Sequence, residues 1–206
     1  GLIIAFGVVG NTGEAPTVPE DNAQLHHDLA EVWLRKQRFE LSRQHSLRAV
    51  ELRPIYPSAL HNLAAAELAL DRPAQAVQYA ARALQLHPYR GRTRLLHAQA
   101  LNRLGRHDEE MAELQHAVKL EPDLWEAHYH LGRLLLRTGS PDAAAAHLSR
   151  AESNLAADYW VSYDLARAWH VAGRLVEAEA ALQRARTTDP RGADALSLSG
   201  VVSLAA

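Results

Sequence analysis

The chain has 206 residues, of which 48% are hydrophobic and 22% charged, and its net charge at neutral pH is −2. A chain of this length can bury a substantial apolar core, and its composition is ordinary for a globular protein. The sequence lacks the excess positive charge that is typical of nucleic-acid-binding proteins. It contains no cysteine, which excludes disulfide bonds, thiolate metal sites and cysteine nucleophiles.

Residues 1–10 are apolar and uncharged, and residues 11–22 contain Gly13, Pro16 and Pro19. A membrane-spanning helix needs about 20 apolar residues, so 1–10 are too few to cross a bilayer. We expect residues 1–22 to be an apolar N-terminal segment followed by a linker. Residues 1–10 are either the end of an upstream anchor or signal sequence, or an element that packs against this protein or a neighbour. These features favour an exported or membrane-anchored protein over a cytoplasmic one.

The rest of the chain has a period of 34 residues. One series with this spacing consists of the alanines Ala49, Ala83, Ala117, Ala151 and Ala185. A second series consists of the prolines Pro54, Pro88, Pro122 and Pro190. A fixed period of this length is typical of stacked supersecondary units rather than of a globule with a single core.

Each unit is predicted to be a pair of helices. In residues 125–138 the apolar side chains follow near-helical spacing, and Gly139 provides a left-handed helix stop. Ser140-Pro141-Asp142 then begins the second helix, with Ser140 as the N-cap. Gly105 and Gly173 occupy the position of Gly139 in other units. Gln37 also stands there, and because glutamine disfavours the left-handed conformation, we expect a looser turn at Gln37.

The 34-residue step, the Leu131-Gly132 pair, the alanines and the prolines resemble the tetratricopeptide repeat family. The resemblance covers one domain, residues 23–206, with five full units and a half unit: 23–56, 57–90, 91–124, 125–158, 159–192 and 193–206. It implies an all-α fold, a right-handed superhelical solenoid of helix-turn-helix repeats. It also implies that the first helix of each unit lines a concave face, and that the protein is a scaffold or peptide-binding module rather than an enzyme.

The family geometry directs the second, fifth, ninth and thirteenth residues of each first helix toward the groove. The candidate peptide-binding residues are therefore Arg92, Arg103, Tyr129, Arg133, Arg137, Trp160, Tyr163 and Arg167. Tyrosine, tryptophan and arginine are enriched at binding hot spots. These side chains predict a groove for a peptide that carries acidic and apolar residues. The alternative is a solvated helix face with charges four residues apart.

Motifs for catalysis or cofactor binding are absent from the sequence. It has no nucleophile elbow, phosphate-binding loop or dinucleotide fingerprint, so no catalytic residue is predicted. Twelve histidines occur, but neighbours such as His128 and His130 point to different helix faces, and neither a metal site nor a cofactor is predicted. The acidic run Asp108-Glu109-Glu110 is interpreted as complementing a helix N-terminus. The arginines at 90, 92 and 94 are interpreted as a solvated turn rather than as an RNA contact.

Three hypotheses for function remain. The first is a scaffold that binds a protein or peptide partner in its concave groove. The second is a structural subunit of an end-to-end filament or homo-oligomer, in which residues 1–10 of one copy cover the apolar residues 193–206 of the next. The third is a docking or regulatory domain of a larger membrane-anchored enzyme, with membrane contact only through an upstream anchor.

Overall fold

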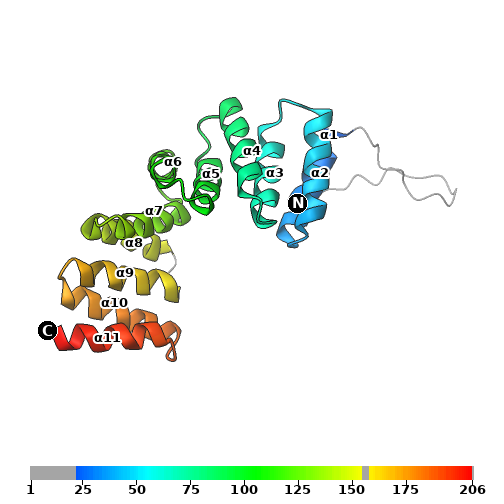
Figure 1. Ribbon diagram of the computed structural model, residues 1–206. Helices are drawn as coiled ribbons and strands as arrows, with labels where there is room; N and C mark the ends of the chain where they lie inside the picture. The colour runs from blue at the N-terminus through cyan, green and yellow to red at the C-terminus, as the bar shows by residue number, and fades with distance from the viewer. Residues whose placement is uncertain (1–21, 155–157, 206) are drawn as a thin grey trace.

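The computed structural model describes residues 22–154 and 158–205, and within these ranges the regular secondary structure is entirely helical. The helices are α1 (Ala23–Arg35), α2 (Phe39–Leu52), α3 (Pro57–Ala69), α4 (Pro73–Leu86), α5 (Gly91–Arg103), α6 (His107–Leu120), α7 (Trp125–Arg137), α8 (Pro141–Asn154), α9 (Tyr159–Val171), α10 (Leu175–Thr188) and α11 (Ala193–Ala205). They form a curved row of antiparallel hairpins, with α1 and α11 at opposite ends (Figure 1). The predicted fold class, an all-α solenoid of five hairpins and a half hairpin, is confirmed. The predicted apolar segment 1–10 and the linker up to residue 21 lie outside the described residues.

The periodic alanines form the joints of this row. Ala49, Ala117, Ala151 and Ala185 are fully buried, and Ala83 is almost so. Ala117 on α6, for example, belongs to a cluster that includes Leu95 of α5 and Leu131 of α7. Each second helix therefore packs against two first helices, its own and that of the next hairpin, and a side chain larger than alanine would overpack this contact. This requirement explains why alanine recurs once in every unit.

Glycine serves the same purpose at one position on the first helices. A Cβ atom at Gly132 of α7 would lie 2.6 Å from Leu148 Cγ and 3.1 Å from the carbonyl oxygen of Ala144, both on α8. The equivalent residue is alanine in the other complete hairpins, for example the fully buried Ala64 and Ala166. In the hairpin of α7 and α8 the two helices therefore approach too closely even for a methyl group.

The turn inside each hairpin contains one residue with positive φ. This residue is glycine at 105, 139 and 173, but Asp71 at 58° and Gln37 at 57° adopt the same conformation. The expectation of a looser turn at Gln37 was wrong. Gln37 N donates to Leu34 O at 2.9 Å and Arg38 N donates to Trp33 O at 2.9 Å, which is the hydrogen-bond pattern found around Gly105. The packing of α1 against α2 therefore overrides the local preference of glutamine.

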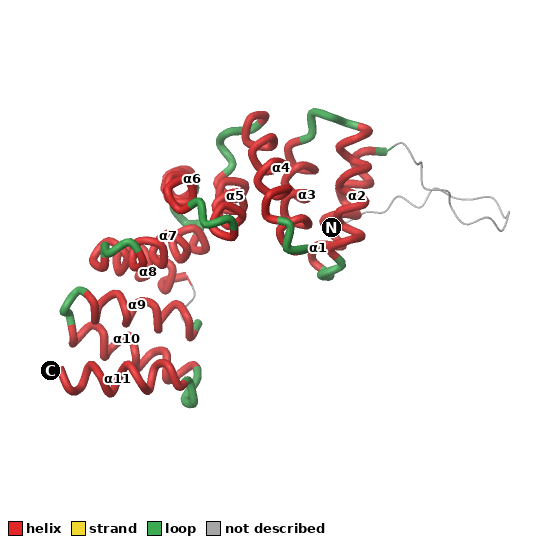
Figure 2. Tube along the Cα trace, viewed as in Figure 1, coloured by secondary structure: helices red, strands yellow, loops and turns green. Residues whose placement is uncertain are grey.

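The first helices line one wall of the row. Direct contacts join the first helices of neighbouring hairpins: α1 to α3, α3 to α5, α7 to α9, and α9 to α11. Among the described residues, the second helices of neighbouring hairpins make fewer direct contacts than these pairs do. In a curved stack the helices on the inner side come closer together, so the first helices form the concave side. The pair α5 and α7 is not among these close pairs, and the row bends at this junction (Figures 1 and 2). Within the described ranges no helix combines the length and apolarity needed to cross a membrane.

The turn at Gln37 gives a prediction for stability. Glycine adopts positive φ without the steric cost of a Cβ atom, which is roughly 1–2 kcal/mol. Gln37→Gly should therefore raise the free energy of unfolding by about 1 kcal/mol in urea titrations. Gly105→Gln is the matched control, because no atom lies within 4 Å of a Cβ placed there, and it should lower the free energy by a similar amount. Equal stability of all three proteins would contradict this account of the turn.

Candidate binding groove

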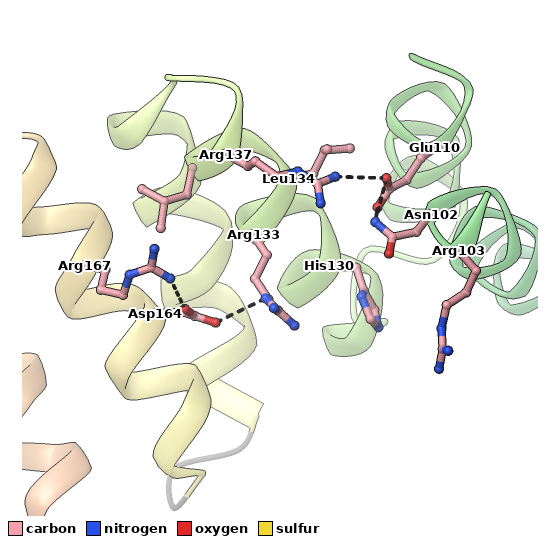
Figure 3. Close-up of a pocket in the computed structure, with 10 residues that line it drawn as sticks. Asn102, Arg103, Glu110, His130, Arg133, Leu134, Arg137, Asp164 and Arg167 are labelled. Atoms are coloured by element: carbon pink, nitrogen blue, oxygen red, sulfur yellow. Dashed lines mark hydrogen bonds and ion pairs between the residues drawn. The ribbon is translucent and has the colours of Figure 1, made fainter. Parts of the chain in front are cut away.

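A cavity of about 550 Å³ opens where the row bends, between α5 and α6 on one side and α7 and α9 on the other (Figure 3). We call it the basic cavity; its lining residues are Asn102, Arg103, Glu110, His130, Arg133, Leu134, Leu136, Arg137, Asp164 and Arg167. Four of the eight residues predicted from the sequence, all of them arginines, meet here. They come from three successive first helices, so only the stacking of hairpins brings them together.

Asp164 holds two of these arginines in place. Its side chain is only 7% exposed, and it accepts a hydrogen bond from Arg167 at 3.0 Å. Arg133 Nε lies 3.4 Å from the other carboxylate oxygen, to which the hydroxyl of Tyr129 also donates at 3.3 Å. Burial raises the pKa of Tyr129 to about 12, with the Asp164 charge as the second cause, so this hydroxyl keeps its proton. Figure 3 shows Asp164 lying between the two guanidinium groups.

Glu110 holds a third arginine. It is 3% exposed, and both of its oxygens accept hydrogen bonds from Asn102 Nδ2, at 2.8 and 2.9 Å. Arg137 of the next hairpin donates to it at 3.3 Å. The equivalent residues in the other hairpins are small and fully buried: Ser42, Ala76, Ala144 and Ala178. Glu110 does stand in the first turn of α6, as the sequence interpretation assumed, but its side chain is part of the cavity.

The basic cavity keeps an excess of positive charge. Its four arginines face two buried carboxylates, and the side chains of Arg133, Arg137 and Arg167 remain about half exposed. The fourth, Arg103, pairs with Asp71 at 3.4 Å, but both partners are well exposed, so this pair contributes little. Burial, with the nearby charge of Arg133, lowers the pKa of His130, which favours the neutral imidazole. The cavity is therefore suited to an anionic group that can approach the free edges of the guanidinium groups.

Two smaller hollows lie along the same row of first helices, and we call them and the basic cavity together the groove. The aromatic pocket, of about 280 Å³, is lined by Trp125, Glu126, Tyr129, His130, Asp158, Trp160 and Val161. The acidic hollow, of about 360 Å³, is lined by Arg92, Glu121, Pro122, Asp123, Leu124, Trp125 and Glu126. His130 borders both the cavity and the aromatic pocket, and Trp125 and Glu126 border both smaller hollows. The basic cavity and the acidic hollow therefore each share a wall with the aromatic pocket.

The structure places most of the predicted residues along this groove. Tyr129 and Trp160 line the aromatic pocket, and Arg92 lines the acidic hollow. Tyr163 borders none of the three spaces; its ring stacks on Tyr159 at 6.0 Å, and Arg167 lies over it at 5.8 Å. That these residues bind a peptide stays a prediction. Sequence reasoning missed Glu110 and Asp164, and an acid at a position where other units bury a small or apolar residue is the signal that marks Glu110.

Four of the histidines form two pairs, and others contact residues of different types. His128 Nδ1 lies 2.8 Å from His147 Nδ1, and His26 Nδ1 lies 2.9 Å from His45 Nδ1. His128 and His130 face different partners, as the sequence predicted, since His130 contacts Gln99 instead. Across the described part of the chain, no three histidine or acidic side chains are grouped as metal ligands would be.

Comparisons with known proteins give a consistent result. Two family models, both described as tetratricopeptide repeat, match residues 95–159 and 135–200. Among solved structures, PilF of Pseudomonas aeruginosa is 19% identical with a TM-score of 0.78, over 90% of this chain and 85% of that one. YrrB, described as a TPR protein with an unusual peptide-binding site, is 18% identical with a TM-score of 0.72, over 88% and 94%. A thermophilic TPR protein of Thermus thermophilus is 22% identical with a TM-score of 0.65, over 89% and 100%. A search of curated protein sequences finds no match.

His61, on the concave side of α3, gives a prediction for pH dependence. Burial, reinforced by Arg90 and Arg92, lowers the pKa of His61 from 6.5 to about 4. On acidification the unfolded chain therefore binds a proton that the folded chain does not, so stability is full above pH 6.5 and falls toward pH 4. At a pH of about 4.5 the loss from this group is about 2–3 kcal/mol.

Urea unfolding at a pH of about 7 and of about 4.5 tests this expectation. His61→Gln, which can still hydrogen-bond Thr93, should remove that part of the loss. His87→Gln, at an exposed histidine, should leave the loss as it is in the parent protein. An unchanged pH dependence in His61→Gln would show that His61 titrates normally in the fold.

Proposed function

The chain belongs to the tetratricopeptide repeat family, and we propose that it is an interaction scaffold that binds an acidic segment of a partner protein in its concave groove. The observation that carries the proposal is the basic cavity, where three arginines from two neighbouring hairpins are held by buried carboxylates and still face solvent. Arginine in this setting binds carboxylates with paired, directional hydrogen bonds. The peptide-binding site named for YrrB supports the proposal by analogy of fold. We propose no catalytic role, because such repeats serve in general as scaffolds.

The arginines are held in position before any partner arrives. Arg133 lies over the ring of Tyr129 at 5.5 Å and also pairs with Asp164, so two contacts restrain its guanidinium group. Arg167 is held in the same way by Tyr163 and Asp164. A restrained side chain loses less conformational entropy on binding than a free one, which favours affinity. The groove is therefore suited to bind an extended segment without rearranging.

The buried carboxylate determines how the proposal is tested. Charge reversal of Arg133 and Arg167 would leave Asp164 buried among like charges and destabilise the fold. We instead expect Asp164→Asn to keep one oxygen that accepts from an arginine, to place an amide group that can donate to the Tyr129 hydroxyl, and to remove one competing charge. This variant should bind an acidic peptide at least as tightly as the parent protein. In that background, Arg133→Gln with Arg167→Gln should weaken binding about tenfold or more, because hydrogen bonds to charged groups are lost.

The measurement is fluorescence anisotropy with a labelled peptide of alternating glutamate and leucine, and with its lysine–leucine counterpart. Arg38→Gln with Arg191→Gln removes the same charge at exposed positions in turns, and should leave affinity within twofold of the parent value. Urea titrations establish that every variant is folded. Equal binding by the Asp164→Asn protein with and without the two arginines would refute the proposal.

Self-association is a second candidate, supported by the surface of α10 and α11. Leu175, Val176 and Ala180 of α10 and Val202 of α11 line an apolar hollow of about 420 Å³. Val176 is 82% exposed, whereas its equivalents in the other hairpins are Glu40, Ala74, Asp108 and Asp142. The apolar character of this surface is therefore particular to the last complete hairpin.

Light scattering distinguishes the two candidates. If residues 1–10 cover this surface in a second copy, the intact chain should form oligomers, and the chain without residues 1–15 should be monomeric. Val176→Asp introduces the charge found at position 142 and should also reduce association. A monomeric intact chain at high concentration would eliminate the second candidate and leave the first unaffected.

A further inference from the structure

The aromatic pocket has the opposite electrostatic character to the basic cavity beside it. Three aromatic rings border it, those of Trp125, Tyr129 and Trp160, together with the carboxylates of Glu126 and Asp158. No lysine or arginine is among its lining residues. The groove thus changes from positive to negative within a few residues along α7.

Two of these rings differ from those of the other tryptophans in the contacts that they make; the Trp160 ring meets Tyr159 and Tyr163 edge-to-face, at 5.0 and 6.2 Å. Trp33 and Trp169, the other two tryptophans, each have a cation of the same chain over the ring: Lys36 at 5.4 Å and Arg174 at 4.2 Å. Within the described ranges no such cation lies over Trp125 or Trp160, and Trp160 is 54% exposed. An indole face attracts an ammonium group through its quadrupole, and tryptophan does so best of the aromatic residues.

The carboxylates add charge at fixed positions. Asp158 caps α9, and its Oδ1 accepts hydrogen bonds from Trp160 N at 2.9 Å and Val161 N at 3.1 Å. These bonds to the first turn of α9 fix the orientation of a carboxylate that belongs to the pocket lining. Glu126 comes from α7, so the two acids approach the pocket from neighbouring hairpins. Indole rings that have no cation over them, together with two carboxylates in the same lining, are complementary to a cation on an apolar stem.

We propose that the aromatic pocket is a binding site for the ammonium group of a lysine side chain. This rests on the proposed function, because the lysine belongs to the same partner segment whose acidic group enters the basic cavity. Along α7, Tyr129 is four residues from Arg133 and eight from Arg137, about 6–12 Å at roughly 1.5 Å per residue. An extended peptide covers that distance in about two to four residues. The partner segment therefore carries a lysine about two to four residues away from an acidic residue.

The first test uses the cation alone. Tetramethylammonium chloride is titrated into the ¹⁵N-labelled protein, and the four indole N–H signals are followed by NMR. The signals of Trp125 and Trp160 should shift and saturate, while those of Trp33 and Trp169 should not shift, because each already has a cation over its ring. Sodium chloride at equal ionic strength is the control. Shifts equal to those in sodium chloride, or equal at all four tryptophans, would overturn the assignment.

The second test uses variants and peptides. Trp160→Leu and Glu126→Gln should each weaken tetramethylammonium binding several-fold. A lysine placed three residues from a glutamate should tighten peptide binding about tenfold relative to norleucine, and a trimethyl-lysine peptide shows which form fits better. Equal affinity of the lysine, trimethyl-lysine and norleucine peptides would overturn the inference.

The two proposals fail in different ways. If the glutamate–leucine peptide binds but neither lysine nor tetramethylammonium has an effect, the aromatic pocket is not a cation site and the proposed function stands. If tetramethylammonium shifts the two indole signals but no peptide binds, the cation preference stands and peptide binding in the groove is refuted. Urea titrations of Trp160→Leu and Glu126→Gln exclude unfolding as a cause of lost binding.

Discussion

The close approach of neighbouring helices is the constraint on which the rest of the structure depends. Ala117 and its counterparts let each second helix lie between two first helices, and Gly132 lets α7 approach α8 more closely than a methyl group would allow. Because this contact repeats every 34 residues, each hairpin is placed relative to the last by the same packing. The groove has no core of its own; it exists only because successive first helices are held side by side.

Electrostatics within the groove depend on that packing in turn. Asp164, on the first helix α9, and Glu110, on the second helix α6, are both buried. An unpaired carboxylate would be costly at either position. Each is compensated by an arginine of a neighbouring hairpin, Arg133 for Asp164 and Arg137 for Glu110. The arginines that line the basic cavity are thus structural partners as well as candidate ligands for an anion. The aromatic pocket, one step along α7, has two carboxylates and no arginine among its lining residues, which gives the groove a polarity.

The sequence predicted the fold well because the relevant signal is periodic. One misplaced unit would not have obscured five alanines at equal spacing, and the turn glycines located three of the five hairpins. It predicted the arginines and most aromatic residues of the groove because their helical positions repeat. Glu110 and Asp164 were missed because their burial depends on residues 27 to 35 positions away, which no local pattern reveals. Gln37 was misjudged because local preference was weighed without the packing of the two helices that flank it.

The pairing across hairpin boundaries also limits how this array can be rearranged. Repeat proteins gain and lose whole units readily when each unit offers its neighbours the same surface. Glu110 of α6 pairs with Arg137 of α7, which belongs to the next hairpin. The same hairpin also supplies Arg133, which pairs with Asp164 of α9 in the hairpin after it. Removing or duplicating a single hairpin within residues 91–192 would therefore leave one of these buried carboxylates without its arginine. The first two hairpins are joined in the same way, because the buried Glu67 of α3 accepts a hydrogen bond from Arg43 of α2 at 2.9 Å.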